Sequence, residues 1–94
     1  MKNEIIIDGK INGGITKKIS KLTGNPYANF SIYVEPGIRP PFYMRCFTSG
    51  NVNINILSNI NDGQLIRVKG SIESTLLIDG SYGKQINITE ISIL

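Results

Sequence analysis

Aromatic and basic side chains alternate along residues 42–47, which read Phe-Tyr-Met-Arg-Cys-Phe. In an extended strand, successive side chains point to opposite faces. One face then carries side chains that we expect in the core: Phe42, Met44 and Cys46. The other face carries flat rings around a guanidinium: Tyr43, Arg45 and Phe47. Such a set can stack on nucleobases and contact phosphates, but tyrosine and arginine are also enriched at protein interfaces, so both interpretations stay open.

A second alternating segment, residues 27–35, complements the first. Its apolar face is formed by Ala28, Phe30, Ile32 and Val34. Tyr27 and Tyr33 lie on its opposite face, with the same parity as the aromatic–arginine face of residues 42–47. If the two segments pair as neighbouring strands, these rings form one patch. The pattern therefore predicts a binding surface across two adjacent strands, with Phe47 either in it or in the core.

Basic side chains elsewhere are further candidates for phosphate contacts. A glycine-rich connection carries Lys17, Lys18 and Lys21, and a proline-bounded loop carries Arg39. The outward side of a strand over 64–78 carries Arg67 and Lys69. A hairpin turn carries Lys84 and the exposed ring of Tyr82. Lysine clusters in loops are as often simply solvated surface. Glu73 and Asp79 would oppose phosphate binding near Arg67 and Lys69.

Strand-like segments separated by glycine, proline and asparagine dominate the chain and predict an all-β fold. We expect strands at residues 3–11, 27–35, 42–47, 64–78 and 85–94. Gly9 suggests a bulge or a bending point, and a slip in the alternation near Glu90 suggests another bulge. Residues 51–61 fit a strand or a helix, and Gly63 would suit a helix C-cap.

Composition limits the classes of function. The 94 residues predict a single domain, 1–94, with a formal net charge of +3 that permits polyanion binding. There is no histidine, and the acidic residues show no metal-binding or paired-carboxylate spacing, so we expect no enzyme activity, no metal and no cofactor. No apolar run is long enough to span a membrane, and Cys46 is the sole cysteine, so we expect a cytoplasmic protein without a membrane partner.

The order of these elements is three strands, an insertion of about a dozen residues, and a long two-stranded hairpin. A five-stranded Greek-key barrel with one short helix between the third and fourth strands is the plan of the OB-fold. On pattern alone, an SH3-like barrel or a small sandwich also fits.

Five segments, in order along nearly the whole chain, resemble bacterial single-stranded DNA-binding proteins. They are NEIIIDGKI (3–11), GNPYANFSIYV (24–34), FYMRCFTSG (42–50), NDGQLIRVKGSI (61–72) and DGSYGKQ (79–85). Each motif is weak alone, but the five share the family's order and spacing. The resemblance implies an OB-fold and favours a helix over 51–61.

The chain also departs from the family it resembles. It has no tryptophan, and of the positions that match the family's stacking aromatics only Tyr43 is aromatic, the others being Ile38, Ser49 and Leu77. Asp62 stands where the family has lysine. The chain ends at Leu94, so we expect no acidic tail for recruiting partner proteins. These features are typical of a divergent phage, plasmid or mobile-element member, or of a relative of primosomal replication protein N.

The resemblance implies a protein that coats and protects single-stranded DNA without sequence preference, through stacking and phosphate contacts. It also implies a homodimer or homotetramer. RNA as the natural ligand stays open. The alternative is an OB-fold protein-interaction or structural subunit of a replication complex with weak or no DNA binding, which the loss of tryptophan favours.

Overall fold

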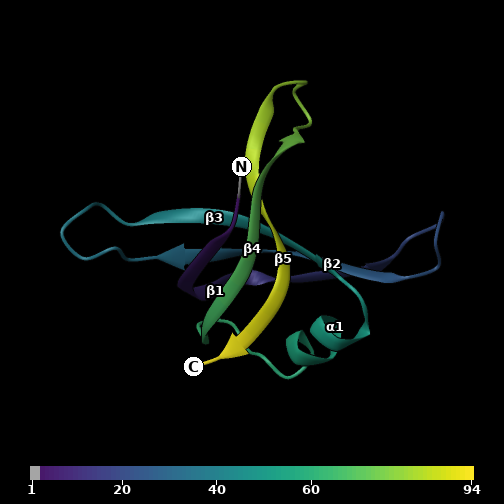
Figure 1. Cartoon of the computed structure of the whole chain (residues 1–94), viewed down its shortest axis with the longest axis horizontal. Helices are drawn as coiled ribbons and strands as arrows, with labels where there is room; N and C mark the ends of the chain where they lie inside the picture. The colour runs from purple at the N-terminus through teal and green to yellow at the C-terminus, as the bar shows by residue number, and fades with distance from the viewer. Residues whose placement is uncertain (1–2) are drawn as a thin grey trace.

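The computed structural model describes residues 3–94, which form five strands and one short helix (Figure 1). In chain order these are β1 (Ile5–Ile19), β2 (Pro26–Val34), β3 (Phe42–Ser49), α1 (Asn51–Leu57), β4 (Leu65–Leu76) and β5 (Tyr82–Ile93). The sheet closes into a barrel in the order β1-β2-β3-β5-β4, with β3 and β5 parallel and all other neighbours antiparallel. This is the predicted OB-fold, with its helix between the third and fourth strands.

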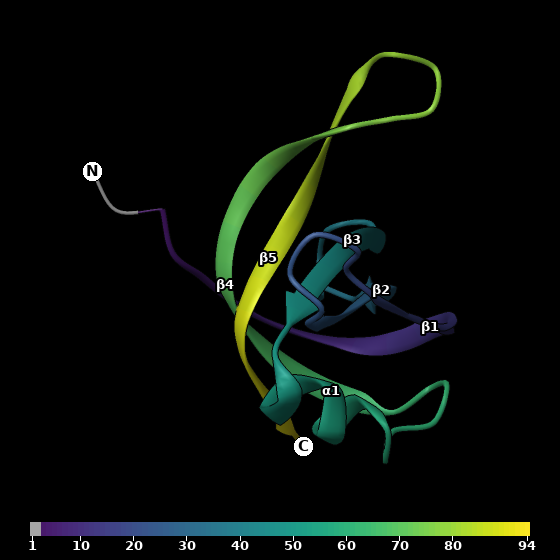
Figure 2. The ribbon, with the colours of Figure 1, turned by 90° about the vertical axis from the view of Figure 1, so that its right-hand side faces the viewer.

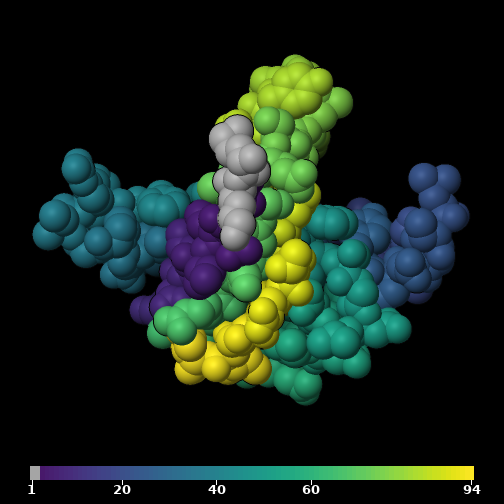
Figure 3. All heavy atoms as spheres, in the orientation of Figure 1, coloured from purple at the N-terminus to yellow at the C-terminus, as the bar shows by residue number. Residues whose placement is uncertain are grey.

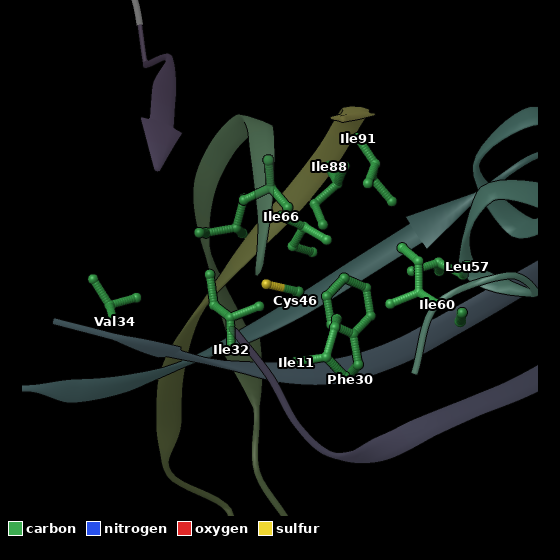
Figure 4. Packing of buried hydrophobic residues seen from close by; sticks show 13 residues of the cluster. Ile11, Phe30, Ile32, Val34, Cys46, Leu57, Ile60, Ile66, Ile88 and Ile91 are labelled. Carbon is green, nitrogen blue, oxygen red and sulfur yellow. The ribbon is translucent and has the colours of Figure 1, made fainter. Parts of the chain in front are cut away.

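The core fills the barrel with apolar, mostly aliphatic side chains from every strand and from the helix region (Figure 4). The predicted alternation of β2 is confirmed, because Ala28, Phe30, Ile32 and Val34 are all buried. Cys46 lies inside as expected, and burial raises the pKa of its thiol to about 12. The prediction for Phe42 was wrong. It opens β3 opposite Val34, where the ladder extends past the barrel, and it is 39% exposed.

β1 is longer than expected, because residues 12–19 continue the strand instead of forming a connection. Gly13 and Gly14, both with positive φ, are two extra residues between Asn12 and Ile15 in the ladder with β2. The bulge therefore lies here and not at Gly9, whose register with β4 is regular. A Cβ at Gly9 would approach the Ile32 side chain at 3.1 Å, so this position requires glycine for close packing.

The helix prediction for residues 51–61 is confirmed in type, but α1 ends at Leu57 with Ser58 as its C-cap. Gly63 is therefore not the cap; its N–H donates to the carbonyl of Ile11 at 2.7 Å. Asn53 is buried, and its amide donates to Thr48 Oγ1 at 2.9 Å and to the Thr89 carbonyl at 3.3 Å. These bonds fasten α1 to β3 and β5.

Three hairpins extend beyond the barrel: the β1–β2 loop, the β2–β3 loop and the β4–β5 arm (Figures 1 and 2). The arm begins above a bulge at which Lys69 pairs with Glu90 and Gly70 with Ile88, so that Thr89 is the extra residue. This confirms the predicted slip near Glu90. A Cβ on Gly70 would lie 2.0 Å from the Asn87 carbonyl oxygen, so only glycine fits. No helix within residues 3–94 could cross a membrane.

Candidate nucleic-acid interface

The outward face of β2 and β3 carries two pairs of aromatic rings. In the ladder, Tyr33 lies directly opposite Tyr43, and their ring centroids are 5.1 Å apart at an interplanar angle of 54°. Tyr27 and Phe47 form the second pair, with centroids 5.8 Å apart and an angle of 33°. Phe47 is half-buried against this tyrosine and does not enter the barrel core. All four predicted rings thus lie on one face, with one pair at each end of it.

Arg45 lies between the two pairs, opposite Ser31. Tyr43 and Phe47 are four positions apart along β3, which corresponds to about 13 Å in an extended strand. The guanidinium is exposed, and within residues 3–94 no carboxylate lies within ion-pair distance of it. A cation without an acidic partner, flanked by rings, can bind a phosphate without first breaking an ion pair.

An open groove of about 750 Å³ crosses the middle of this face. Arg45 and Tyr43 line one side, and the glycine bulge of β1 lines the other. Polar side chains that the sequence reasoning missed complete the walls: Asn12, Thr16, Asn29, Ser31, Thr75 and Gln85. The residues among these on β2 share the parity of Tyr27 and Tyr33, so strand alternation was the signal that could have identified them.

Lysines of β1 border both ring pairs. Lys18 lies directly opposite Tyr27 in the ladder, and Lys10 lies opposite Tyr33. Lys10 was not among the predicted site residues; its Nζ is 3.8 Å from a carboxylate oxygen of Glu35. Lys17 points to the other side of β1, where its Nζ donates to Ser58 Oγ at 2.9 Å. The predicted lysine cluster is therefore divided between two faces.

The β4–β5 arm adjoins the Tyr43 end of the face. Arg45 pairs with Gln85 in the parallel ladder, and a hollow of about 450 Å³ is lined by Tyr43, Arg45, Leu77 and Lys84 among others. Lys84, one of the predicted residues, thus lies beside the aromatic face. Tyr82 lies farther along the arm, opposite Leu76, and is 74% exposed.

Two more predicted cations lie in the loops at the ends of the face. Lys21 follows β1 and lines a hollow with Tyr27 and Phe47. Arg39 lies exposed in the β2–β3 loop, beyond the Tyr33–Tyr43 pair. Both positions extend the positive charge past the ring pairs, toward the two loops that project to either side in the space-filling view (Figure 3).

Arg67 and Lys69 lie apart from the aromatic face, on the outward side of β4 next to β1. Arg67 Nε and a second guanidinium nitrogen donate to the two carboxylate oxygens of Asp8, at 2.7 and 3.0 Å. This hydrogen-bonded ion pair lowers the pKa of Asp8 and raises that of Arg67. Lys69 Nζ is 4.0 Å from Glu4. The structure does not bring these two predicted residues into the patch.

In residues 3–94, no cluster of histidine, cysteine or acidic side chains could hold a metal ion. The Glu73 carboxylate accepts a hydrogen bond from the Asn87 amide, whose oxygen accepts one from Gln85 at 2.7 Å. Asp79 accepts hydrogen bonds from Ser81, which lower the pKa of its carboxyl group. The acids of the arm are thus engaged within the arm.

No family model and no curated protein matches this chain by sequence. Solved structures do match over its full length. An SSB from Plasmodium falciparum, solved in complex with ssDNA, shares 15% identity and a TM-score of 0.85, covering 100% of this chain and 96% of that one. The mitochondrial single-stranded DNA-binding protein Rim1 of S. cerevisiae shares 20% identity and a TM-score of 0.82, with coverages of 100% and 96%.

The SSB domain of a Synechococcus protein shares 12% identity and a TM-score of 0.78, covering 97% of this chain and 94% of that one. At such identities the similarity concerns the fold. The resemblance found in the sequence motifs is therefore confirmed at this level: the chain has the OB-fold of single-stranded DNA-binding proteins.

Proposed function

We propose that this protein binds single-stranded DNA, without sequence preference, across the β2–β3 face. One observation carries the proposal: two aromatic ring pairs lie on one open face, and between them lies the guanidinium of Arg45, which has no carboxylate within ion-pair distance in residues 3–94. Every base has a flat π-face, so stacking on such rings tolerates any sequence, while cations follow the phosphates.

The mechanism is passive. Bases stack on the exposed rings of each pair, and the backbone crosses the groove near Arg45, with Lys18 and Lys84 contacting phosphates to either side. A strand held in this way is withheld from re-annealing and from nucleases. Because phosphate contacts release counterions, affinity should fall steeply as salt rises.

The structural neighbours support this assignment. Each is named as an SSB or single-stranded DNA-binding protein, and the Plasmodium falciparum protein was solved with ssDNA. We propose further that this chain assembles as a homodimer or homotetramer. Light scattering on the purified full chain measures the mass directly, and a monomer at micromolar concentration would contradict the assembly but not the binding.

Fluorescence anisotropy of labelled oligo-dT, titrated with the full chain at low and at moderate salt, tests the proposed function. We expect saturable binding at low salt and a large loss of affinity at moderate salt. Tyrosine emission should be quenched over the same range of concentration. The absence of binding at low salt would refute the proposal and favour the alternative of a protein-docking face. A parallel titration with oligo-U shows whether the protein also binds RNA.

A further inference from the structure

An acidic side chain stands beside the Tyr33–Tyr43 end of the aromatic face. Asp62 lies in the connection between α1 and β4, and its side chain is exposed. It lines a hollow of about 270 Å³ together with Lys10, Tyr33 and Tyr43, among others. On its β1 side, this end of the face therefore meets a carboxylate, which repels phosphates.

The place of this carboxylate is fixed by hydrogen bonds between the connection and β1. The Gly63 N–H donates to the Ile11 carbonyl at 2.7 Å, and the Ile11 N–H donates to the Gln64 carbonyl at 3.0 Å. Asp62 Oδ1 then accepts a hydrogen bond from the Gly14 N–H at 3.4 Å. The negative charge is thus held against the glycine bulge of β1.

The glycine bulge forms the β1 wall of the groove that crosses the aromatic face. Backbone N–H groups exposed at turns can bind anions. Here the N–H of Gly14 is already engaged by Asp62. A phosphate that approached this wall would have to displace a group of its own charge. The wall is therefore unfavourable for the backbone of a bound strand.

The opposite side of this end carries the opposite charge. Arg45 lines the groove there, and Lys84 lies beyond it on the arm, in a hollow shared with Tyr43. On the β1 side, the charge of Lys10 is compensated by Glu35, whose carboxylate oxygen lies 3.8 Å from the lysine Nζ. The charge therefore changes across this end of the face, from negative beside β1 to positive beside the arm.

We propose that Asp62 bounds the DNA-binding face: its charge keeps the phosphates of the bound strand away from β1 and directs the strand toward Lys84. The inference rests on the proposed function and deepens it. In this role Asp62 makes no contact with the strand and acts by disfavouring a second path across β1. Removing its charge should therefore strengthen binding, whereas removing a residue that contacts the strand weakens it.

Asp62→Asn tests the charge alone, because asparagine keeps an oxygen that can accept the Gly14 N–H. In the anisotropy titration with oligo-dT at about 0.1 M salt, we expect its affinity to rise by about 2- to 5-fold. Glu90→Gln is the matched control. It makes the same change in net charge at an exposed position that pairs with Lys69, away from the aromatic face. Its affinity should stay close to that of the parent chain, because salt screens distant charges.

A double-mutant cycle tests the direction of the strand. Asp62→Lys should steepen the slope of log affinity against log salt by about 0.7, because it adds a phosphate contact beside β1. In the parent chain, Lys84→Gln should weaken binding by about 2- to 5-fold. In the Asp62→Lys background the same change should cost much less, since the strand then has a second path. An equal cost in both backgrounds would overturn the inference.

The remaining outcomes separate this inference from the proposed function. If the parent chain binds but Asp62→Asn binds no more tightly, or Glu90→Gln gains as much, the acidic boundary is wrong and the binding function stands. No binding by the parent chain at low salt would overturn both. Urea unfolding of Asp62→Asn should match that of the parent chain, which shows that the gain in affinity comes from the charge and not from a change in stability.

Discussion

Two outward faces of the barrel each carry an arginine, but the two arginines differ in whether a carboxylate pairs with them. On the β2–β3 face, Arg45 stands between aromatic rings without a carboxylate in reach within residues 3–94. On the β1–β4 face, both oxygens of Asp8 accept hydrogen bonds from Arg67. A phosphate meets a free cation on the first face and must displace a carboxylate on the second. The same residue type is therefore available to a polyanion on one face only.

The surroundings of the two arginines reinforce the difference. Rings flank Arg45 on both sides along β3. Arg67 instead lies directly opposite Asp8 of β1 in the ladder, and Glu4, which precedes β1, lies 4.0 Å from the neighbouring Lys69. Binding to single strands needs cations and stacking platforms together. Of these two faces within residues 3–94, only the β2–β3 face combines them, and we expect this combination to determine where the strand binds.

The largest effect is expected from Tyr43→Ala, with Tyr82→Ala as its matched control. Both tyrosines are well exposed, 63% and 74%, but only Tyr43 is paired with another ring on the β2–β3 face. We expect Tyr43→Ala to weaken binding of oligo-dT by roughly 5- to 150-fold. Tyr82→Ala should cost much less. Equal losses of affinity in the anisotropy titration would show that the exposure of a tyrosine, and not its position on the β2–β3 face, determines its contribution to binding.

A smaller effect is expected from Lys18→Gln, with Lys17→Gln as the neighbouring control. Lys18 lies on the aromatic face, whereas Lys17 donates to Ser58 on the other side of β1. Removing one phosphate contact should lower the slope of log affinity against log salt by about 0.7 and weaken binding a few-fold. The Lys17 variant should keep the parental slope; a change as large as that of Lys18 would place the strand on both sides of β1.

The smallest effect is expected from Asp8→Asn. Arg67 lowers the folded-state pKa of Asp8 below 3.8, so the carboxylate stabilises the fold above pH 3.8, and this contribution is lost as the pH falls below it. The variant should therefore unfold at slightly lower urea concentration at neutral pH, with the difference shrinking at acidic pH. Affinity for oligo-dT should not change. Tighter binding would mean that the freed Arg67 reaches DNA and that the β1–β4 face takes part.

Strand alternation in the sequence was enough to predict the five strands and the composition of the aromatic face, whereas the choice of the OB-fold over other small β folds rested also on the resemblance to single-stranded DNA-binding proteins. The parity of β2 separates buried Phe30 and Ile32 from outward Tyr27 and Tyr33, and the structure agrees. The side of the sheet on which a side chain lies depends only on the backbone being extended, so it can be predicted without knowing the neighbouring strand.

Features that depend on which residues pair across neighbouring strands could not be predicted from the sequence. The ring pairs require the register of β2 and β3, and the ion pair of Arg67 requires Asp8, which is 59 residues away along the chain. Phe42 has the parity of the core, but its place at the end of the ladder exposes it. Lys17 and Lys18 looked equivalent because Gly13 and Gly14 suggested a loop, although β1 passes through both glycines as a bulge.

The central claim is that the strand binds the face of Arg45 and not that of Arg67. The most direct test is a salt-dependent anisotropy titration of oligo-dT with Arg45→Gln and Arg67→Gln. For Arg45→Gln we expect affinity to fall by about 3- to 10-fold at low salt and the salt slope to decrease by about 0.7, while Arg67→Gln binds as the parent chain does. Equal losses, or a larger loss for Arg67→Gln, would contradict the account.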